Sequence, residues 1–230
     1  MKKKKTETFP TQLNREDYFQ CPIWFADAPQ FVEDLNKASD SYIEIAKKNL
    51  KKDIAKRNKK FGDRGDMGHV FHSTPLVADP NFNQLTNYIG ATAHNLLVEM
   101  GFDLTNYQLF TTEMWVQEFA KAGGGHQRLH THWNGHISGF YFLKVNPETT
   151  SQPMFYDPRP GKTQIDLPLK DGSKVTEASP IIQFMAKPGR LVFFNSFLPH
   201  LYTVDNGYEP FRFIHFNCQV FPKDVLRRGQ

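Results

Sequence analysis

Two hydrophobic periodicities divide the chain into a helical first part and a strand-rich second part. Apolar residues recur at helical spacing over residues 30–58 and again over residues 79–101. Asp79 is a suitable N-cap for the second helix, Pro80 suits its first turn, and Gly101 ends it. The two apolar stripes consist of Phe31, Leu35, Tyr42, Ile43, Ala46, Leu50 and Ile54, and of Phe82, Leu85, Ile89, Leu96 and Met100.

From residue 107 onward, short runs rich in β-branched and aromatic residues alternate with turns containing Pro, Gly and Asn. The runs 190–197 and 211–221 are apolar almost throughout, so we expect both to be central strands. Residues 170–173 have the composition of a hairpin turn. This pattern predicts a mainly β protein with N-terminal helices, either a sandwich or a barrel. The predicted strands are 18–25, 107–119, 136–145, 154–156, 164–167, 181–185, 190–197 and 211–221, with a histidine-rich segment after the second of them.

The length of 230 residues is sufficient for a single domain with a full core. Within it we expect a disordered basic tail over 1–10, a mostly helical part over 11–105 and a β-rich core over 106–222. The net charge is +4, and Lys2 to Lys5 alone supply four positive charges, so the remainder is close to neutral. A second basic cluster over 47–60 indicates a solvated helix face, and without a recognisable motif it does not predict nucleic-acid binding.

Cysteine content and hydropathy indicate a cytoplasmic protein that does not enter a membrane. Cys21 and Cys218 are too few for a disulfide framework, and two reduced thiols are the simpler interpretation. No apolar stretch approaches the roughly 18 residues of a membrane span. The basic start lacks the apolar segment of a secretory signal. The oligomeric state cannot be read from these features.

Histidines carry the clearest chemical signal in the sequence. Four of the nine fall within residues 126–136. His130 and His132 are separated by one residue, so an extended backbone places both imidazoles on one face. His200 closes an apolar run that begins at Gly189. Two neighbouring histidines and one distant histidine predict a non-heme iron site, with open positions for a cosubstrate and O₂.

Arg212 follows His200 by twelve residues and lies in another strand-like run. A buried cation is costly unless it is paired. We therefore expect Arg212 to bind a carboxylate-bearing cosubstrate through a bidentate contact.

Over residues 107–221 the chain resembles the 2-oxoglutarate (2OG)/Fe(II) oxygenases, distant relatives of prolyl 4-hydroxylases that are frequent in marine bacteria and their phages. The resemblance implies a double-stranded β-helix (jelly roll) backed by two or more helices. It also implies Fe(II), 2OG and O₂, an unidentified peptidyl or small-molecule substrate, and release of succinate and CO₂. The matching stretches are 124–132, 138–143, 155–159, 188–194, 199–200 and 212–217.

Two positions depart from the pattern of this family. His132 stands where the family usually has Asp or Glu. If His132 binds, three neutral histidines hold the iron, namely His130, His132 and His200; if it does not, another group or water must fill that position. Ile214 stands where a hydroxyl side chain often assists the cosubstrate-binding arginine. We expect Tyr141 to assist Arg212 instead.

The remaining polar and aromatic residues of interest have weaker expectations. His126 and His136 should lie beside the metal or face the substrate, whereas His69, His72 and His94 should be ordinary histidines. His215 is out of phase with Arg212 and should face away from the site. Asp157 and Arg159 either orient substrate or form a structural turn with an ion pair, and Trp133 either lines the substrate cleft or packs in the core.

Two other classes remain open at the level of sequence. A cupin, a metal-binding barrel without 2OG chemistry, would share the G-x₅-H-x-H pattern that begins at Gly124. However, His136 stands where the cupin glutamate belongs, and His200 lies 68 residues after His132, which is too far for the compact cupin spacing. The other alternative is a non-catalytic protein with a degenerate oxygenase fold.

Overall fold

The computed structural model describes residues 15–228, so the predicted basic tail lies outside the described residues. Its helices are α1 (Val32–Phe61), α2 (Asn83–Glu99) and α3 (Lys223–Arg228). Its strands are β1 (Ile23–Asp27), β2 (Val70–His72), β3 (Tyr107–Phe119), β4 (Gln127–His130), β5 (Ile137–Lys144), β6 (Pro153–Tyr156), β7 (Ile181–Gln183), β8 (Arg190–Asn195), β9 (His200–Tyr202) and β10 (Phe211–Pro222). None of the described helices is long and apolar enough to cross a bilayer.

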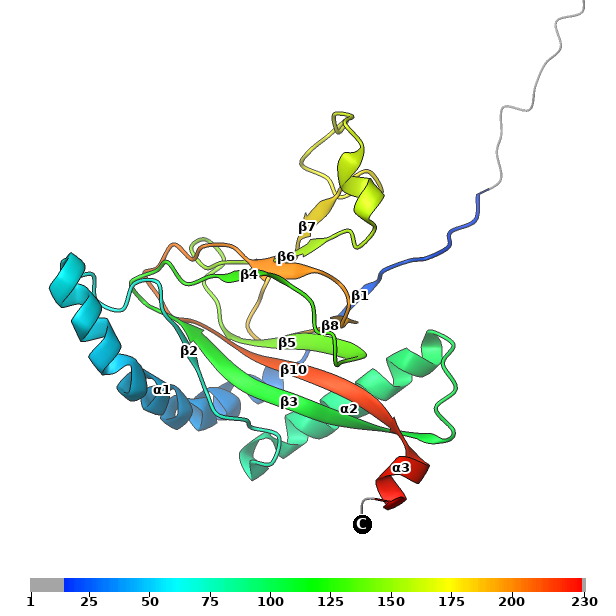
Figure 1. Ribbon diagram of the computed structural model, residues 1–230, viewed down its shortest axis with the longest axis horizontal. Helices are drawn as coiled ribbons and strands as arrows, with labels where there is room; N and C mark the ends of the chain where they lie inside the picture. The colour runs from blue at the N-terminus through cyan, green and yellow to red at the C-terminus, as the bar shows by residue number, and fades with distance from the viewer. Residues whose placement is uncertain (1–14, 229–230) are drawn as a thin grey trace, which may run out of the picture.

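The strands form two antiparallel sheets that face each other (Figure 1). The larger sheet has the order β1-β8-β5-β10-β3-β2, and the smaller has the order β4-β9-β6-β7. Helices α1 and α2 lie against the outer face of the larger sheet (Figure 1). As predicted from their apolar character, β8 and β10 are interior strands of the larger sheet. The architecture is therefore mainly β, with two sheets and a helical layer.

The central strands β5, β8 and β10 are buried on both faces over most of their length, and their residues alternate between two hydrophobic clusters. Tyr141, Ile214 and Phe216 belong to the cluster under the helices. Phe140 and Phe213 belong to the cluster between the two sheets. This alternation follows from the period of two along a strand. Which of the two faces a residue occupies decides whether it can reach the histidine site.

Local chemistry explains the ends of the two long helices. The Asp79 carboxylate accepts a hydrogen bond from the Asn81 backbone N–H at 2.9 Å and caps the 3₁₀ turn that leads into α2. Gly101 follows α2 with a φ of +94°, and Gly62 follows α1 with a φ of +90°. Glycine adopts these left-handed conformations at little cost. The helices predicted from periodicity are confirmed, with α1 extending three residues beyond the predicted end.

Three local predictions differ from the structure. Residues 164–167 form no strand: a 3₁₀ turn over Pro160–Gln164 ends at the first of them, and the others have no regular secondary structure within the long segment between β6 and β7. The strand considered at 18–25 begins only at Ile23. The Asp171 carboxylate accepts from the Ser173 backbone N–H at 3.0 Å, so the turn at 170–173 is an Asx turn within the segment between β6 and β7.

Candidate metal centre

Three histidines converge between the two sheets. Two come from strands of the smaller sheet, and the third comes from the loop after β4. His130 ends β4 and is directly paired with His200 at the start of β9. His132 lies two residues beyond β4, where its backbone N–H donates to the Ser196 carbonyl at 2.8 Å. The donor atoms of the three imidazoles all lie within 4.8 Å of one another. In the described part of the chain no carboxylate joins this group.

Backbone carbonyls fix the tautomers of two of these rings. The His130 Nδ1 lies 2.7 Å from the Arg128 carbonyl oxygen, and the His200 Nδ1 lies 2.9 Å from the Leu198 carbonyl oxygen. A carbonyl only accepts hydrogen bonds, so each Nδ1 carries the proton and each Nε2 keeps its lone pair. The Nε2 atoms of His132 and His200 are buried without a hydrogen-bond partner. Buried nitrogens that converge in this way fit a metal ion, which would satisfy them.

Burial keeps the imidazoles in the neutral form that binds metals. Burial is the main cause that lowers the pKa of His200 to about 3, and the charges of His130 and His132 contribute to the same shift. Burial also lowers the pKa of His132 to about 4, with a smaller contribution from the charge of His130. At neutral pH these two rings are therefore uncharged, and in His200, whose Nδ1 carries the proton, Nε2 can bind a metal without losing one.

His215 is a fourth histidine at the site, and the prediction that it faces away is wrong. It lies on β10 with its ring 4.6 Å from the ring of His132 and 4.5 Å from the ring of Trp115. Its Nε2 is buried without a partner. Burial lowers the pKa of His215 well below its ordinary value, with the charges of the other histidines as the second cause.

A polar network that the sequence did not reveal lies beneath His132. The Asn217 amide nitrogen donates to the Glu113 carboxylate at 2.5 Å and lies 3.5 Å from the His132 Nδ1. The Ser138 hydroxyl donates to the Asn217 amide oxygen at 2.6 Å and lies 2.8 Å from the Ser196 hydroxyl. Ser138, Ser196 and Asn217 are buried and Glu113 is partly buried, and together these groups satisfy one another and fix the position of the residues behind His132.

Arg212 lies on the opposite face of β10 from the histidines, so the prediction that it binds the cosubstrate is wrong. Its guanidinium donates to Glu118 at 2.7 Å and to Asp40 of α1 at 2.7 Å. It also donates to the Asn36 carbonyl at 3.1 Å. The cation therefore has its anionic partners within the fold, under the helical layer.

Tyr141 faces the helices as well, and its predicted role beside the cosubstrate is also wrong. Its hydroxyl donates to the Ala28 carbonyl at 2.6 Å, and its ring packs 6.4 Å from that of Phe31. Burial raises the pKa of Tyr141 to about 12. Tyr141 and Arg212 thus both belong to the face that the helices cover.

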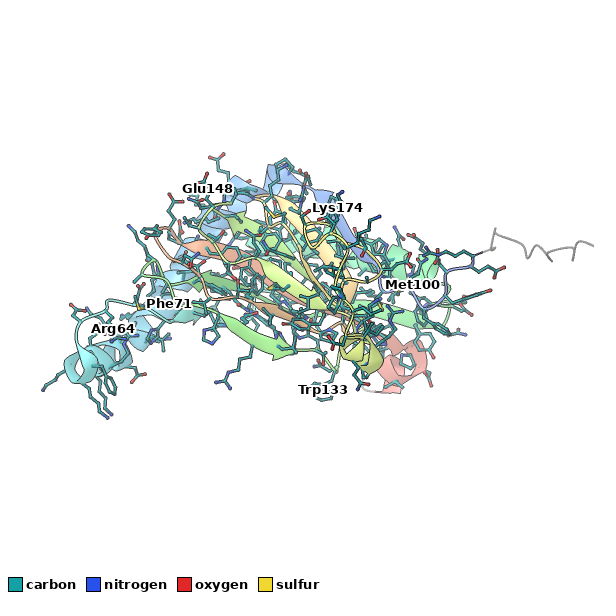
Figure 2. All side chains as sticks on the ribbon, turned by 90° about the horizontal axis from the view of Figure 1, so that it is seen from above. Arg64, Phe71, Met100, Trp133, Glu148 and Lys174 are labelled. Carbon is teal, nitrogen blue, oxygen red and sulfur yellow. The ribbon has the colours of Figure 1, made fainter. Side chains whose placement is uncertain are left out.

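The other predicted residues lie outside the cluster. His126 is exposed, with its Nδ1 3.3 Å from the Gly124 carbonyl. The Nδ1 of His136 accepts from the Val220 N–H at 3.3 Å. Trp133 is 91% exposed, so it does not pack in the core, and Figure 2 shows it at the edge of the molecule.

An open pocket of about 390 Å³ leads to the histidines. Besides His130, His132 and His215 it is lined by Arg128 of β4 and by His72, which the sequence had marked as ordinary. The remaining lining residues are Trp115, Gln117 and Gln127. The pocket is lined by polar and aromatic side chains and opens the predicted ligands to solvent.

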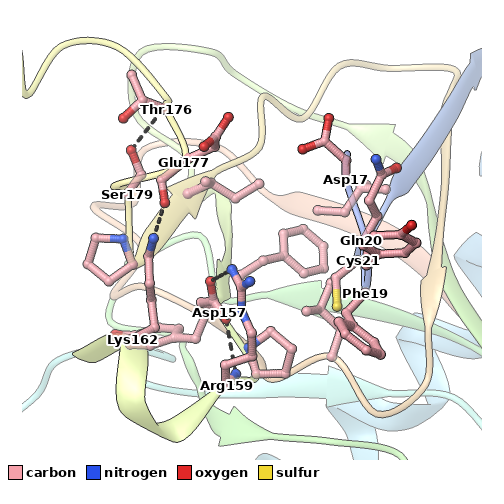
Figure 3. A pocket seen from close by; sticks show the side chains of 18 of the residues that line it. Asp17, Phe19, Gln20, Cys21, Asp157, Arg159, Lys162, Thr176, Glu177 and Ser179 are labelled. Carbon is pink, nitrogen blue, oxygen red and sulfur yellow. Dashed lines mark hydrogen bonds and ion pairs between the residues drawn. The ribbon is translucent and has the colours of Figure 1, made fainter. Parts of the chain in front are cut away.

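A second pocket, of about 480 Å³, lies between the chain preceding β1 and the segment after β6 (Figure 3). Phe155 and Leu198 line it and also contact His200. Asp157 pairs with Arg159 there, with the Arg159 Nη2 2.6 Å from the carboxylate (Figure 3). Asp157 also accepts from the Arg159 backbone N–H at 3.0 Å, so this pair forms the turn with an ion pair that was one of the two alternatives.

Comparison with known proteins agrees with this arrangement. Residues 113–217 match the model of the family described as "Putative 2OG-Fe(II) oxygenase". This segment contains the three converging histidines, and the match favours an oxygenase over the cupin alternative. No curated protein matches the chain.

Solved structures similar to this chain have low sequence identity to it. AviO1 from Streptomyces viridochromogenes Tue57 is 14% identical, with 85% of this chain and 89% of that chain covered and a TM-score of 0.52. The non-heme monooxygenase ThoJ, as its nickel complex, is 10% identical, with 86% and 76% covered and a TM-score of 0.52. A prolyl-4-hydroxylase from Pseudomonas putida is 12% identical, with 86% and 91% covered and a TM-score of 0.49. At these identities the first two likenesses show a shared fold.

Proposed function

We propose that this chain, which belongs to the 2OG-Fe(II) oxygenase family through residues 113–217, is a dioxygenase whose iron is held by His130, His132 and His200. The observation that carries the ligand assignment is the convergence of the three imidazoles, two of them with buried, unpartnered Nε2 atoms. The expected reaction is hydroxylation of a substrate with release of succinate and CO₂.

The order of the strands supports a jelly roll. Along the chain, β3, β5, β8 and β10 belong to the larger sheet, whereas β4, β6, β7 and β9 belong to the smaller. The chain therefore passes repeatedly from one sheet to the other, as it does in a double-stranded β-helix. We infer one domain, because the helices cover the outer face of the same larger sheet whose inner face borders the site.

The donor set fits ferrous iron. Imidazole is a common ligand of non-heme iron, and three ligands on one side leave positions free on the other. When bound, Fe(II) together with 2OG and O₂ supplies the oxidising power that inserts oxygen into a C–H bond. Three neutral histidines leave the charge of the metal uncompensated by protein, which favours binding of an anionic cosubstrate.

The protein's own residues orient and shield this centre. The Arg128 and Leu198 carbonyls hold the rings of His130 and His200 so that Nε2 points into the site. Phe140, Phe155 and Phe194 pack around His200 at ring-centroid distances of 5.7, 5.9 and 4.8 Å. These aromatic rings exclude water from the side of the metal site next to His200. Cosubstrate and O₂ therefore reach the site through the pocket that His72 and Arg128 line.

The substrate class remains a peptidyl side chain or a small molecule. The pocket of Figure 3 borders the far side of His200 through Phe155 and Leu198 and carries charged groups of both signs. A screen for compounds or peptides that stimulate succinate formation would define the class.

Anaerobic equilibrium dialysis with Fe(II), followed by aerobic assay of succinate formed from 2OG, tests the proposal. We expect one iron per wild-type chain and iron-dependent succinate formation. His130→Ala and His200→Ala should lose both, whereas His126→Ala, a matched change outside the cluster, should retain both. Circular dichroism establishes that each variant is folded. Wild-type iron binding in folded His130→Ala and His200→Ala would refute the ligand assignment.

A further inference from the structure

The far carboxylate of 2OG needs a partner that the inner face of β10 does not offer. On that face, the strand presents Phe211, Phe213 and His215 toward the smaller sheet. The rings of Phe211 and Phe213 are packed against Tyr202 at 5.6 and 4.8 Å. The Tyr202 hydroxyl is buried there without a partner and could donate one hydrogen bond, but a carboxylate placed among these rings would meet no cation to balance its charge, which is strongly unfavourable.

Arg128 is the only lysine or arginine among the described residues that line the histidine pocket. It lies on β4, two residues before His130, and its backbone carbonyl orients the His130 ring. Its side chain is exposed, and no ion pair joins it to a carboxylate in the described part of the chain. By contrast, Arg159, Arg190 and Arg212 are each paired with carboxylates.

The pocket offers further polar groups but no acidic side chain that would repel an anion. Gln127 donates its side-chain amide to Gln117, and both line the pocket. His215 adds a buried Nε2 without a partner. The pocket therefore brings together a guanidinium without an ion-pair partner, the buried His215 Nε2 without a hydrogen-bond partner, and two of the three predicted ligands, His130 and His132. Such a site can hold an anion that also reaches the metal.

We propose that Arg128 binds the far carboxylate of 2OG while the keto-acid end chelates the iron. This inference rests on the proposed function. It gives 2OG a different position from the one that binding to Arg212 would require. The dicarboxylate would then lie in the pocket between β4 and β3, near Trp115, and would not point into the aromatic interior of the sandwich. A guanidinium suits the role because it forms bidentate contacts with a carboxylate.

The test compares two keto acids that differ only at the far end. 2OG and 2-oxopentanoate share the chelating group, but 2-oxopentanoate has a methyl group where 2OG has its second carboxylate. Their affinities for the full-length, Co(II)-loaded protein are measured by calorimetry, so that no turnover is required. The variants are Arg128→Gln, Arg128→Lys and the matched control Arg64→Gln, which removes an exposed arginine in the loop after α1 (Figure 2).

We expect Arg128→Gln to bind 2OG about 10- to 100-fold more weakly, the usual effect of losing hydrogen bonds to a charged group. Its affinity for 2-oxopentanoate should not change, so the preference for the dicarboxylate should disappear. Arg128→Lys should be intermediate, because it keeps the charge and loses the fork. Arg64→Gln should behave as wild type.

An unchanged preference for 2OG in Arg128→Gln would overturn the inference and leave the proposed function intact. Equal loss of affinity for both keto acids would also overturn it, because Arg128 would then act on the metal end. If the metal-loaded wild type binds neither keto acid, the proposed function fails and this inference fails with it.

Discussion

The guanidinium of Arg212 lies 2.7 Å from the carboxylate of Glu118, and both side chains are almost completely buried. Arg212 on β10 and Glu118 on β3 are also direct neighbours in the sheet register. Lys47 contacts the same carboxylate at 2.6 Å, and Asp40 contacts the guanidinium at 2.7 Å. This network therefore joins two central strands to α1.

Arg212→Leu should lower the free energy of unfolding by about 3–5 kcal/mol, because it leaves the Glu118 charge buried without its main partner. Urea denaturation measures this loss. The affinity of the folded variant for 2OG should equal that of wild type, since Arg212 faces away from the histidines. Wild-type stability combined with weakened 2OG binding would contradict the role assigned here.

His132→Asp should retain iron, because a carboxylate at this position gives the two-histidine, one-carboxylate set found in many non-heme iron oxygenases. His132→Ala should bind iron much more weakly, since one of three ligands is lost. Anaerobic dialysis with Fe(II) measures both variants. If His132→Ala retains wild-type affinity while His215→Ala does not, the third ligand is His215.

Gly139→Ala should destabilise the protein by more than about 3 kcal/mol, at the upper end of overpacking effects. A Cβ at this position would lie 2.2 Å from the Phe216 ring and 2.2 Å from the Val192 carbonyl oxygen. The carbonyl belongs to a paired strand and cannot move aside. Gly161→Ala, where nothing lies within 4 Å of the added methyl, is the matched control and should melt as wild type does.

Tyr141 should make the fold sensitive to alkaline pH. Its pKa is raised from 10.0 to about 12, first by burial. The unfolded chain therefore loses this proton first as the pH rises, so the contribution of Tyr141 is complete below pH 10 and is lost between about pH 10 and 12. The stability difference between wild type and Tyr141→Phe, measured by urea denaturation, should shrink by about 1–3 kcal/mol from pH 8 to pH 11.5. A constant difference would contradict this linkage.

Much of the fold could be predicted because its signals are local. The apolar stripes of α1 and α2, the cap at Asp79 and the stop at Gly101 each depend on neighbouring residues. The apolar runs at β8 and β10 likewise predicted interior strands. The strand expected at 164–167 is absent because pairing partners, which sequence does not reveal, decide whether a short run becomes a strand.

The error at β10 has a definite physical cause. Alternation correctly placed Arg212, Ile214 and Phe216 in one phase and His215 in the other. Both phases are apolar, because the strand is covered by helices on one side and by the smaller sheet on the other. The pattern therefore could not tell which phase faces the histidines. An acidic residue on a neighbouring strand, Glu118, was the signal for the partner of Arg212.

The histidine site was predictable in part for a similar reason. The H-x-H spacing and the apolar run before His200 are local features, and the structure brings these three residues together. His72, His215 and Asn217 approach the site only through long-range strand pairing. No spacing rule along the chain connects them with His132.

Anomalous diffraction at the iron absorption edge, on crystals grown anaerobically with Fe(II), tests the central claim most directly. We predict one peak per chain, about 2.0–2.2 Å from the Nε2 atoms of His130, His132 and His200, a distance typical of metal–imidazole bonds. Adding 2OG should leave all three contacts in place. A peak that lacks any one of these three nitrogens, or that lies on His72 or His215 instead, would contradict the account.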